Sequence, residues 1–298
     1  MTPVRKNNSE KTDRSRKPSS RSGGKKPFEQ RERKEFKKPY SATGKRRPAA
    51  KGSANPKKSE ESGLIRLNRY IARSGICSRR EADELITTGE VKVNGVIVTE
   101  LGTKVSNVDK IHVADQLIRF EKPTYLLLNK PKGYITTTDD PYKRRTVMAL
   151  IENACKESVY PVGRLDRNTT GLLLFTNDGD MAKKLTHPSS NIRKIYHVHL
   201  DKALTKGDMI KIAEGLNLED GIVKVDEISY AGTGNDKKEI GITLHSGKNR
   251  IVRRIFESLG YQVVKLDRVL FAGLTKKDLK RGHFRFLTPQ EVNFLKML

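Results

Sequence analysis

The chain has 298 residues, of which 60 are Lys or Arg and 35 are Asp or Glu, giving a formal net charge of +25. This excess predicts attraction to a polyanion, either nucleic acid or an anionic membrane surface. A run of about 18 apolar residues does not occur, so a membrane span is not expected. The amino-terminal region has no apolar signal core, which indicates a cytoplasmic protein. The two cysteines, Cys77 and Cys155, have no zinc-ligand spacing and are not expected to form a disulfide.

Residues 1–62 form a basic segment with 20 Lys or Arg and 7 Asp or Glu, a net charge of +13. The segment is rich in Gly, Pro and Ser and has few large apolar side chains. It cannot bury enough surface to offset the entropy of ordering, so we expect a disordered tail. Such a tail can increase RNA affinity through counterion release, or it can simply keep the protein soluble.

Two helices and a hairpin are expected over residues 63–120. Leu64, Leu67 and Ile71 recur at helical spacing. Ser78 and Glu81 have the spacing of a capping box that opens a second helix, which Gly89 ends. Asn94-Gly95 joins two short runs of β-branched residues, as in a type I′ hairpin. This pattern resembles the RNA-binding domain first described in ribosomal protein S4, and its phosphate contacts would be Arg66, Arg69, Arg73, Arg79 and Arg80.

An apolar run at 125–129 predicts a buried strand. Further along, a carboxylate, Asp166, stands between Arg164 and Arg167 in a stretch of turn-forming residues at 161–171. The apolar strand 172–175 follows at once. A carboxylate on a loop held by a rigid strand is a common catalytic arrangement, and flanking guanidinium groups keep it ionised or grip phosphates. The residues alone also allow a structural ion pair at a strand entrance.

An alternating segment at residues 193–200 predicts a strand that carries Tyr196. An aromatic ring can stack on a base, although a core Tyr with a paired hydroxyl fits the same pattern. His197 and His199 share a face of this strand, but the sequence offers no third ligand at a persuasive spacing. We therefore expect no metal site. The sequence also lacks a nucleotide-binding glycine loop, so we expect no cofactor.

A strand is expected to end at Gly247, and a helix follows in which Ile251, Ile255 and Leu259 face the core at intervals of four residues. Basic residues form a stripe beside this apolar face, which suits phosphate contacts at a helix start. Arg250 and Arg254 form the stripe, and with Arg253 they are the expected phosphate contacts.

Several motifs in order resemble the bacterial ribosomal pseudouridine synthases of the RsuA/RluB type. They are Lys130-Pro131-Lys132-Gly133, Gly163-Arg164-Leu165-Asp166, Thr170-Gly171-Leu172-Leu173-Leu174-Phe175-Thr176-Asn177-Asp178-Gly179, and Lys194-x-Tyr196-x-Val198. The similarity extends from about Leu64 to the end of the chain. It implies that Asp166 is the catalytic carboxylate, that Tyr196 lies against the target base, and that Lys248, the basic residue after Gly247, pairs with Asp166. Arg164 and Arg167 would hold the flipped RNA backbone.

The resemblance implies isomerisation of uridine to pseudouridine in ribosomal RNA, with the target uridine flipped out of the RNA. The run 171–176 and the continuation to Ser189 look closer to enzymes of the large-subunit (23S) rRNA, and a 16S rRNA enzyme is the alternative. A ribosome-assembly factor that binds rRNA without catalysis is a further alternative, which would not need Asp166, Tyr196 and Lys248 together.

The expected fold is α/β (α+β). It has a disordered tail at 1–62, an S4-like RNA-binding domain at 63–120 and a catalytic domain at 121–298 built on an antiparallel-rich mixed sheet, with a hinge at 119–123. The expected partner is ribosomal RNA, free or in pre-ribosomal particles, without a membrane, and the protein is expected to be a monomer.

Overall fold

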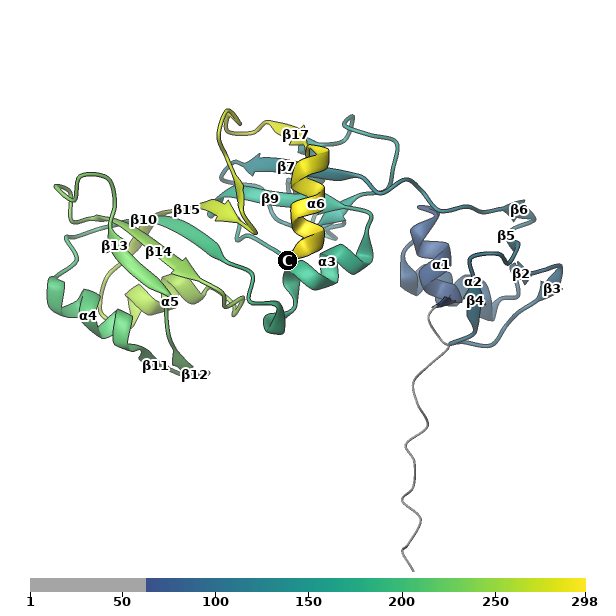
Figure 1. Cartoon of the computed structure of the whole chain (residues 1–298), viewed down its shortest axis with the longest axis horizontal. Coiled ribbons are helices and arrows are strands. Elements are labelled where there is room, and N and C mark those ends of the chain that lie inside the picture. Colours follow the sequence, from purple (N-terminus) through teal and green to yellow (C-terminus); the bar gives the residue numbers. More distant parts are fainter. Residues whose placement is uncertain (1–62) are drawn as a thin grey trace, which may run out of the picture. The chain divides into compact units, whose positions relative to one another are not determined.

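The computed structural model describes residues 63–298 (Figure 1). The predicted disordered tail at 1–62 lies outside the described residues. None of the helices from residue 63 onward is both long and apolar enough to cross a membrane.

The amino-terminal part of the described chain contains two helices and six short strands. The helices are α1 (Leu67–Arg73) and α2 (Arg79–Thr87). Four strands form one sheet in the order β3 (Val96–Ile97), β2 (Val91–Val93), β5 (Ile111–Val113) and β6 (Gln116–Leu117), and β1 (Leu64–Arg66) pairs with β4 (Lys104–Ser106). A core that includes Leu67, Ile71, Ile86, Val91 and Ile111 joins the helices to the strands.

Local sequence signals in this part fold largely as predicted. Ser78 accepts from the amide of Glu81 at 3.3 Å, and the Glu81 carboxylate accepts from the amide of Ser78 at 2.7 Å, so the capping box is confirmed. Asn94 and Gly95 both have positive φ, as a type I′ turn requires. The expectation for Leu64 was wrong, because it lies in strand β1 with 47% of its surface exposed. Pairing of β1 with β4 therefore replaces the first helical turn.

The larger part contains a nine-stranded sheet (Figure 1). Its main path runs β13 (Glu227–Tyr230), β14 (Glu239–Leu244), β10 (Lys194–Leu200), β15 (Val263–Phe271), β9 (Thr170–Thr176), β7 (Tyr125–Lys130) and β17 (Phe284–Phe286). Strand β8 (Tyr160–Pro161) pairs with β9, and β16 (Leu274–Thr275) pairs with β15. The β9–β15 pair is parallel and the other pairs are antiparallel, which confirms the antiparallel-rich mixed sheet.

Helices cover the sheet in two groups. Helices α4 (Lys206–Glu214) and α5 (Ile251–Glu257) pack on β10 and β14, and α3 (Gly179–Thr186) and α6 (Pro289–Met297) pack on β7 and β9. The other face of β7 and β9 is covered by residues between 147 and 165, including the 3-10 helix η1 (Val147–Leu150). A second 3-10 helix, η2 (Pro188–Ser190), follows α3, and the hairpin β11 (Leu216–Leu218) and β12 (Gly221–Val223) precedes β13. Strands β7 and β9 are thus buried on both faces, which explains their unbroken apolar runs.

Gly171 permits the close approach of β9 to β15. It pairs with Arg268, its φ is +107°, and a Cβ atom there would lie 2.3 Å from the carbonyl oxygen of Arg268. A side chain would therefore need a shift of one backbone relative to the other.

We expect Gly171→Ala to lower the free energy of unfolding by about 3 kcal/mol or more, since it combines a backbone clash with a strained φ. The matched control is Gly241→Ala in β14, where a Cβ would meet its nearest neighbour at an ordinary 3.7 Å. Denaturant unfolding measures both variants. Equal and small effects of the two substitutions would contradict the close approach.

Candidate active site

Asp166 lies in a loop between β8 and β9 whose backbone is fixed by the buried side chain of Lys130. The Lys130 ammonium, at the end of β7, donates to the carbonyl oxygens of Thr169 at 2.9 Å, Asp166 at 3.1 Å and Pro131 at 3.2 Å. On the other side of the loop, Thr136 donates to the Leu165 carbonyl oxygen at 2.8 Å. The rigid strand β7 thus sets the position of the Asp166 loop.

Lys130 has no exposed surface, and this burial determines its titration. Burial is the main cause that lowers its pKa to about 8, with the positive charge of Arg281 acting in the same direction and the charge of Asp166 opposing it. At pH 7 the ammonium form still predominates, so it has three N–H donors for the surrounding carbonyl oxygens.

Two guanidinium groups lie near the Asp166 carboxylate. Arg250 Nη1 is 3.6 Å and Arg253 Nε is 3.9 Å from Asp166 Oδ2. Arg253 is buried and donates from Nη1 to the Val263 carbonyl oxygen at 2.8 Å, while its Nε has no hydrogen-bond partner in the described chain. Burial, with repulsion from Arg250, lowers the pKa of Arg253. Arg250 precedes α5 with a left-handed φ of 46°, which is an uncommon backbone conformation for this residue type.

The expected pairing of Lys248 with Asp166 differs from the structure. Lys248 Nζ donates to the carbonyl oxygen of Asp220 at 2.8 Å and lies 3.7 Å from its carboxylate. Arg254 donates to the same carboxylate at 2.9 Å. Asp220 lies in the turn of the β11–β12 hairpin and is the partner of both cations. Arg250 and Arg253, predicted as phosphate contacts, take the place expected for Lys248.

A cavity of about 170 Å³ holds Asp166 and Tyr196 together, as the sequence predicted for these two residues. Lys248 also lines it. The Tyr196 hydroxyl makes no hydrogen bond within residues 63–298, so the alternative of a core Tyr with a paired hydroxyl is not what the structure has. Sequence reasoning missed two cations that line this cavity, Lys194 and Arg268. Lys194 precedes Tyr196 by two residues in the motif that was quoted, whereas nothing in the sequence marked Arg268.

A wider groove of about 700 Å³ also includes Asp166 and is rich in cations. Arg164 and Arg167 line it with exposed side chains, and Arg167 Nε also donates to the Gly133 carbonyl oxygen at 3.4 Å. Arg144, which the sequence analysis did not single out, joins them and pairs with Asp140. The groove therefore presents positive charge around the small cavity, as an RNA backbone would require.

The predicted RNA contacts of the amino-terminal part lie on α1, α2 and the residue before α1. Arg66, Arg79 and Arg80 are exposed, and Arg69 and Arg73 are half-buried. The Arg73 guanidinium lies 4.6 Å from the centre of the Phe120 ring, so part of this side chain serves packing. RNA contact by these five residues stays a prediction.

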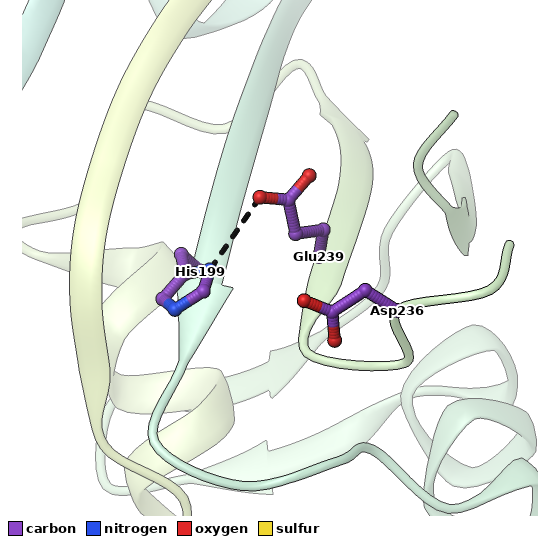
Figure 2. A group of neighbouring side chains, drawn as sticks. All are labelled: His199, Asp236 and Glu239. Carbon is purple, nitrogen blue, oxygen red and sulfur yellow. Dashed lines mark ion pairs between the residues drawn. The ribbon is translucent and has the colours of Figure 1, made fainter. Parts of the chain in front are cut away.

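Two side chains that could bind a metal together with His199, and that the sequence pattern did not indicate, lie beside it (Figure 2). Asp236 and Glu239 bring their carboxylates near its ring, with ligand atoms within 4.8 Å of one another. Glu239 lies 3.6 Å from His199 Nδ1 and 3.3 Å from His197 Nε2, so this carboxylate already contacts both rings. The expectation of no metal stays a prediction.

Asp267 anchors the start of β9 next to the Asp166 loop. Its carboxylate accepts from Thr170 at 2.8 Å and from Arg281 at 2.9 Å, and it also pairs with Lys276. Burial would raise the pKa of Asp267, but the hydrogen bonds from Arg281, Lys276 and Thr170 outweigh it and lower the pKa to about 2. Arg281 also donates to Asn129, which precedes Lys130 in β7.

A mixed sheet with a carboxylate, an aromatic ring and buried cations in one cavity, preceded by a small basic α+β unit, defines an RNA-directed enzyme. The RNA pseudouridylate synthase family model matches residues 124–258, and the S4 domain model matches residues 65–111. The chain belongs to the RNA pseudouridylate synthase family and carries an S4 domain, as the resemblance implied.

Related proteins support the family over most of the chain. The ribosomal large subunit pseudouridine synthase B of Bacillus subtilis is 42% identical over 237 residues, which are 79% of this chain and 97% of that protein. The Haemophilus influenzae protein of the same name is 35% identical over 85% of this chain and 72% of its own length. A crystal structure of a pseudouridylate synthase aligns with a TM-score of 0.57 and 30% identity, covering 78% of this chain and 99% of that one.

We expect Lys130→Met to lower the free energy of unfolding by roughly 2–3 kcal/mol, because buried carbonyl oxygens lose their donor. The exposed neighbour Lys132 gives the matched control Lys132→Met, which should change stability by less than about 0.5 kcal/mol. Urea unfolding at pH 7 measures both. An unchanged stability of Lys130→Met would show that Lys130 does not fix the loop.

The lowered pKa of Asp267 predicts that the protein loses stability in acid. Its pKa is lowered in the folded state, so its contribution is present above about pH 4 and is lost as the pH falls toward 2; it amounts to about 2 kcal/mol. Asp267→Asn should remove this contribution, so the difference in unfolding free energy from wild type should shrink between pH 4 and pH 2. The exposed Asp139→Asn is the control. A difference that stays constant with pH would contradict the assignment.

Proposed function

We propose that this enzyme isomerises one uridine of large-subunit (23S) ribosomal RNA to pseudouridine, with Asp166 as the catalytic carboxylate. The observation that carries the proposal is the single cavity that contains Asp166 and Tyr196 beside the buried guanidinium of Arg253. The names of the Bacillus subtilis and Haemophilus influenzae relatives support the large subunit as the source of the substrate.

Asp166 acts at the ribose in this proposal. Either its carboxylate attacks the anomeric carbon, or the neighbouring carbon loses a proton to give a glycal. Both routes need an ionised, oriented carboxylate, and the guanidinium groups of Arg250 and Arg253 favour that state. Tyr196 supports the base while it rotates, and its unpaired hydroxyl leaves it free to contact the substrate.

The remaining cations bind the RNA around the flipped uridine. Arg164, Arg167, Lys248 and Arg250 line the wider groove that surrounds Asp166. Flipping costs a few kcal/mol, and phosphate contacts by these residues and by the S4 domain offset it. Arg254 contributes once RNA competes with Asp220 for its guanidinium.

Several further features belong to this proposal. The enzyme acts in the cytoplasm as a monomer, without a metal or cofactor, on free RNA or pre-ribosomal particles. Bond energy is conserved within one substrate, so the isomerisation needs no external energy source. Residues 1–62 increase RNA affinity through their net charge of +13.

The test is a pseudouridine map of large- and small-subunit rRNA from cells that lack the protein, complemented with wild type or Asp166→Ala. We expect one large-subunit site to vanish and to be restored by wild type alone, because both proposed routes need the Asp166 carboxylate. Asp178→Ala is unsuitable as a control because Asp178 caps α3, so Glu214→Ala, at an exposed carboxylate of α4, serves instead.

Each other outcome has a distinct meaning. Loss of a small-subunit site alone would assign the enzyme to 16S rRNA. Restoration by Asp166→Ala would remove Asp166 from catalysis. An unchanged map would favour a non-catalytic assembly factor.

A further inference from the structure

Arg268 is a buried guanidinium with unused donors at the wall of the catalytic cavity. It is 3% exposed and lines the cavity that contains Asp166 and Tyr196. Its Nε donates to the Leu172 carbonyl oxygen at 2.8 Å, but its Nη2 is buried without a hydrogen-bond partner in the described chain. A buried cation is costly unless its donors are satisfied, so an unpaired Nη2 indicates a missing acceptor.

The Arg268 side chain is also held in one place. Its guanidinium carbon lies 4.5 Å from the centre of the Phe271 ring, and Tyr196 on β10 pairs in register with Arg268 on β15. The Leu172 carbonyl group fixes the third side of the guanidinium. The unused donors are therefore preorganised, and they belong to the strand next to the one that carries Tyr196.

Lys194 is a second cation in the same cavity with a donor to spare. Its ammonium donates to the carbonyl oxygens of His245 at 2.7 Å and Ile192 at 3.0 Å. Three N–H donors are available, so one remains for a ligand. Burial, followed by repulsion from Arg268, lowers the pKa of Lys194 to about 8, which leaves it largely protonated at pH 7.

We propose that Arg268 and Lys194 hydrogen-bond to the carbonyl oxygens of the flipped uracil and stabilise the negative charge that it acquires when it is detached from the ribose. Both are then catalytic residues that touch the substrate. The inference rests on the proposed isomerase function of this cavity, but it does not depend on which ribosomal subunit holds the target.

The charge follows from the balance of the reaction. The bond between ribose C1′ and uracil N1 breaks, and its electron pair stays on the base, where it is delocalised onto the carbonyl oxygens. After rotation, an electron pair of the base forms the new bond between C5 and C1′. The proton on C5 is then lost, and N1 gains one, so substrate and product are isomers. Fixed donors aimed at the developing charge stabilise the detached base more than the bound uridine.

The surroundings favour a base over a phosphate as the occupant. The cavity is small, about 170 Å³, and apolar walls from Leu266, Ile251 and Phe271 suit a planar ring. Asp166 must reach the ribose carbon that carries the base, so the base occupies this cavity. The phosphates then lie outward, where the exposed Arg164 and Arg167 line the wider groove.

The experiment measures single-turnover pseudouridine formation by the full chain, using total rRNA from cells lacking the protein. The variants are Arg268→Gln and Lys194→Met, and the control is Arg193→Met, which neutralises an exposed neighbour that does not line the cavity. We expect each variant to lower the rate at saturating enzyme by about 100-fold, as loss of one such donor does elsewhere. RNA affinity, measured by filter binding, should change less than about threefold.

A substrate change separates base contact from a structural role. In a synthetic RNA with the modified uridine and its flanks, sulfur replaces O2 or O4, which weakens hydrogen bonding at that atom. One of these substitutions should slow wild type but cause no further slowing in the variant whose donor it faces. Additive losses at both atoms in both variants would overturn the base contact.

Two further outcomes would overturn the proposal that Arg268 and Lys194 contact the base. Folded variants with rates within threefold of wild type would overturn the proposal. A loss that appears entirely in RNA affinity, with the saturating rate unchanged, would assign the cations to phosphate and overturn it as well. Thermal melting reports folding, and Lys194→Met supplies the answer if Arg268→Gln does not fold. Wild-type modification of small-subunit RNA alone would refute the large-subunit proposal, while the variant-to-wild-type ratio would still test this inference.

Discussion

The buried ammonium of Lys130 is the constraint on which the Asp166 loop depends. Residues 163–169 belong to no helix or strand, so the carbonyl groups of this loop depend on turn hydrogen bonds and on side-chain donors. Lys130 supplies such a donor to Asp166 and Thr169 from the end of a strand that is buried on both faces. A neutral side chain of the same size would fill the space, but the Thr169 carbonyl oxygen would lose its donor and the Asp166 carbonyl oxygen would keep only the Thr169 amide. The buried ammonium of Lys130 therefore fixes the geometry of the loop.

A network of side chains extends this support across the sheet. Asn129, the residue before Lys130, accepts from Arg281 and donates to the Leu279 carbonyl oxygen. Arg281 in turn binds Asp267, which binds Thr170 at the start of β9. The two ends of the Asp166 loop region, the end of β7 and the start of β9, are thus connected through β15. The placement of Asp166 therefore depends on β7, β9 and β15 as well as on its own loop.

Sequence reasoning succeeded where the signal is local. The capping box at Ser78, the Asn94-Gly95 turn and the apolar strands predicted at 125–129 and 172–175 each depend on neighbouring residues, and the structure has them. The family motifs also brought Asp166 and Tyr196 to one cavity. These predictions succeeded because each depends on interactions between neighbouring residues or on a long sequence motif.

The failures depend on contacts between distant segments. Lys248 was expected at Asp166, but Asp220, 28 residues earlier, binds it instead. Arg268 was not noticed because a lone Arg in an apolar strand carries no local sign that it is buried. Leu64 had helical spacing, yet pairing with a strand some 40 residues later prevailed. Pairings of this kind depend on the tertiary fold, which residue spacing alone does not report.

Burial divides the cations of this enzyme into two kinds. Exposed groups such as Arg164 and Arg167 are screened by salt and adapt to an irregular polyanion, so they suit RNA binding. Buried groups such as Arg253 and Arg268 are screened little and cannot move far, so they suit a charge at one defined place. Asp166 lies between these two sets, beside Arg250 and Arg253, at the mouth that joins the wide groove to the small cavity. In the proposed reaction, a uridine that leaves the RNA stack would therefore pass from cations that hold any backbone to cations that can stabilise one particular base.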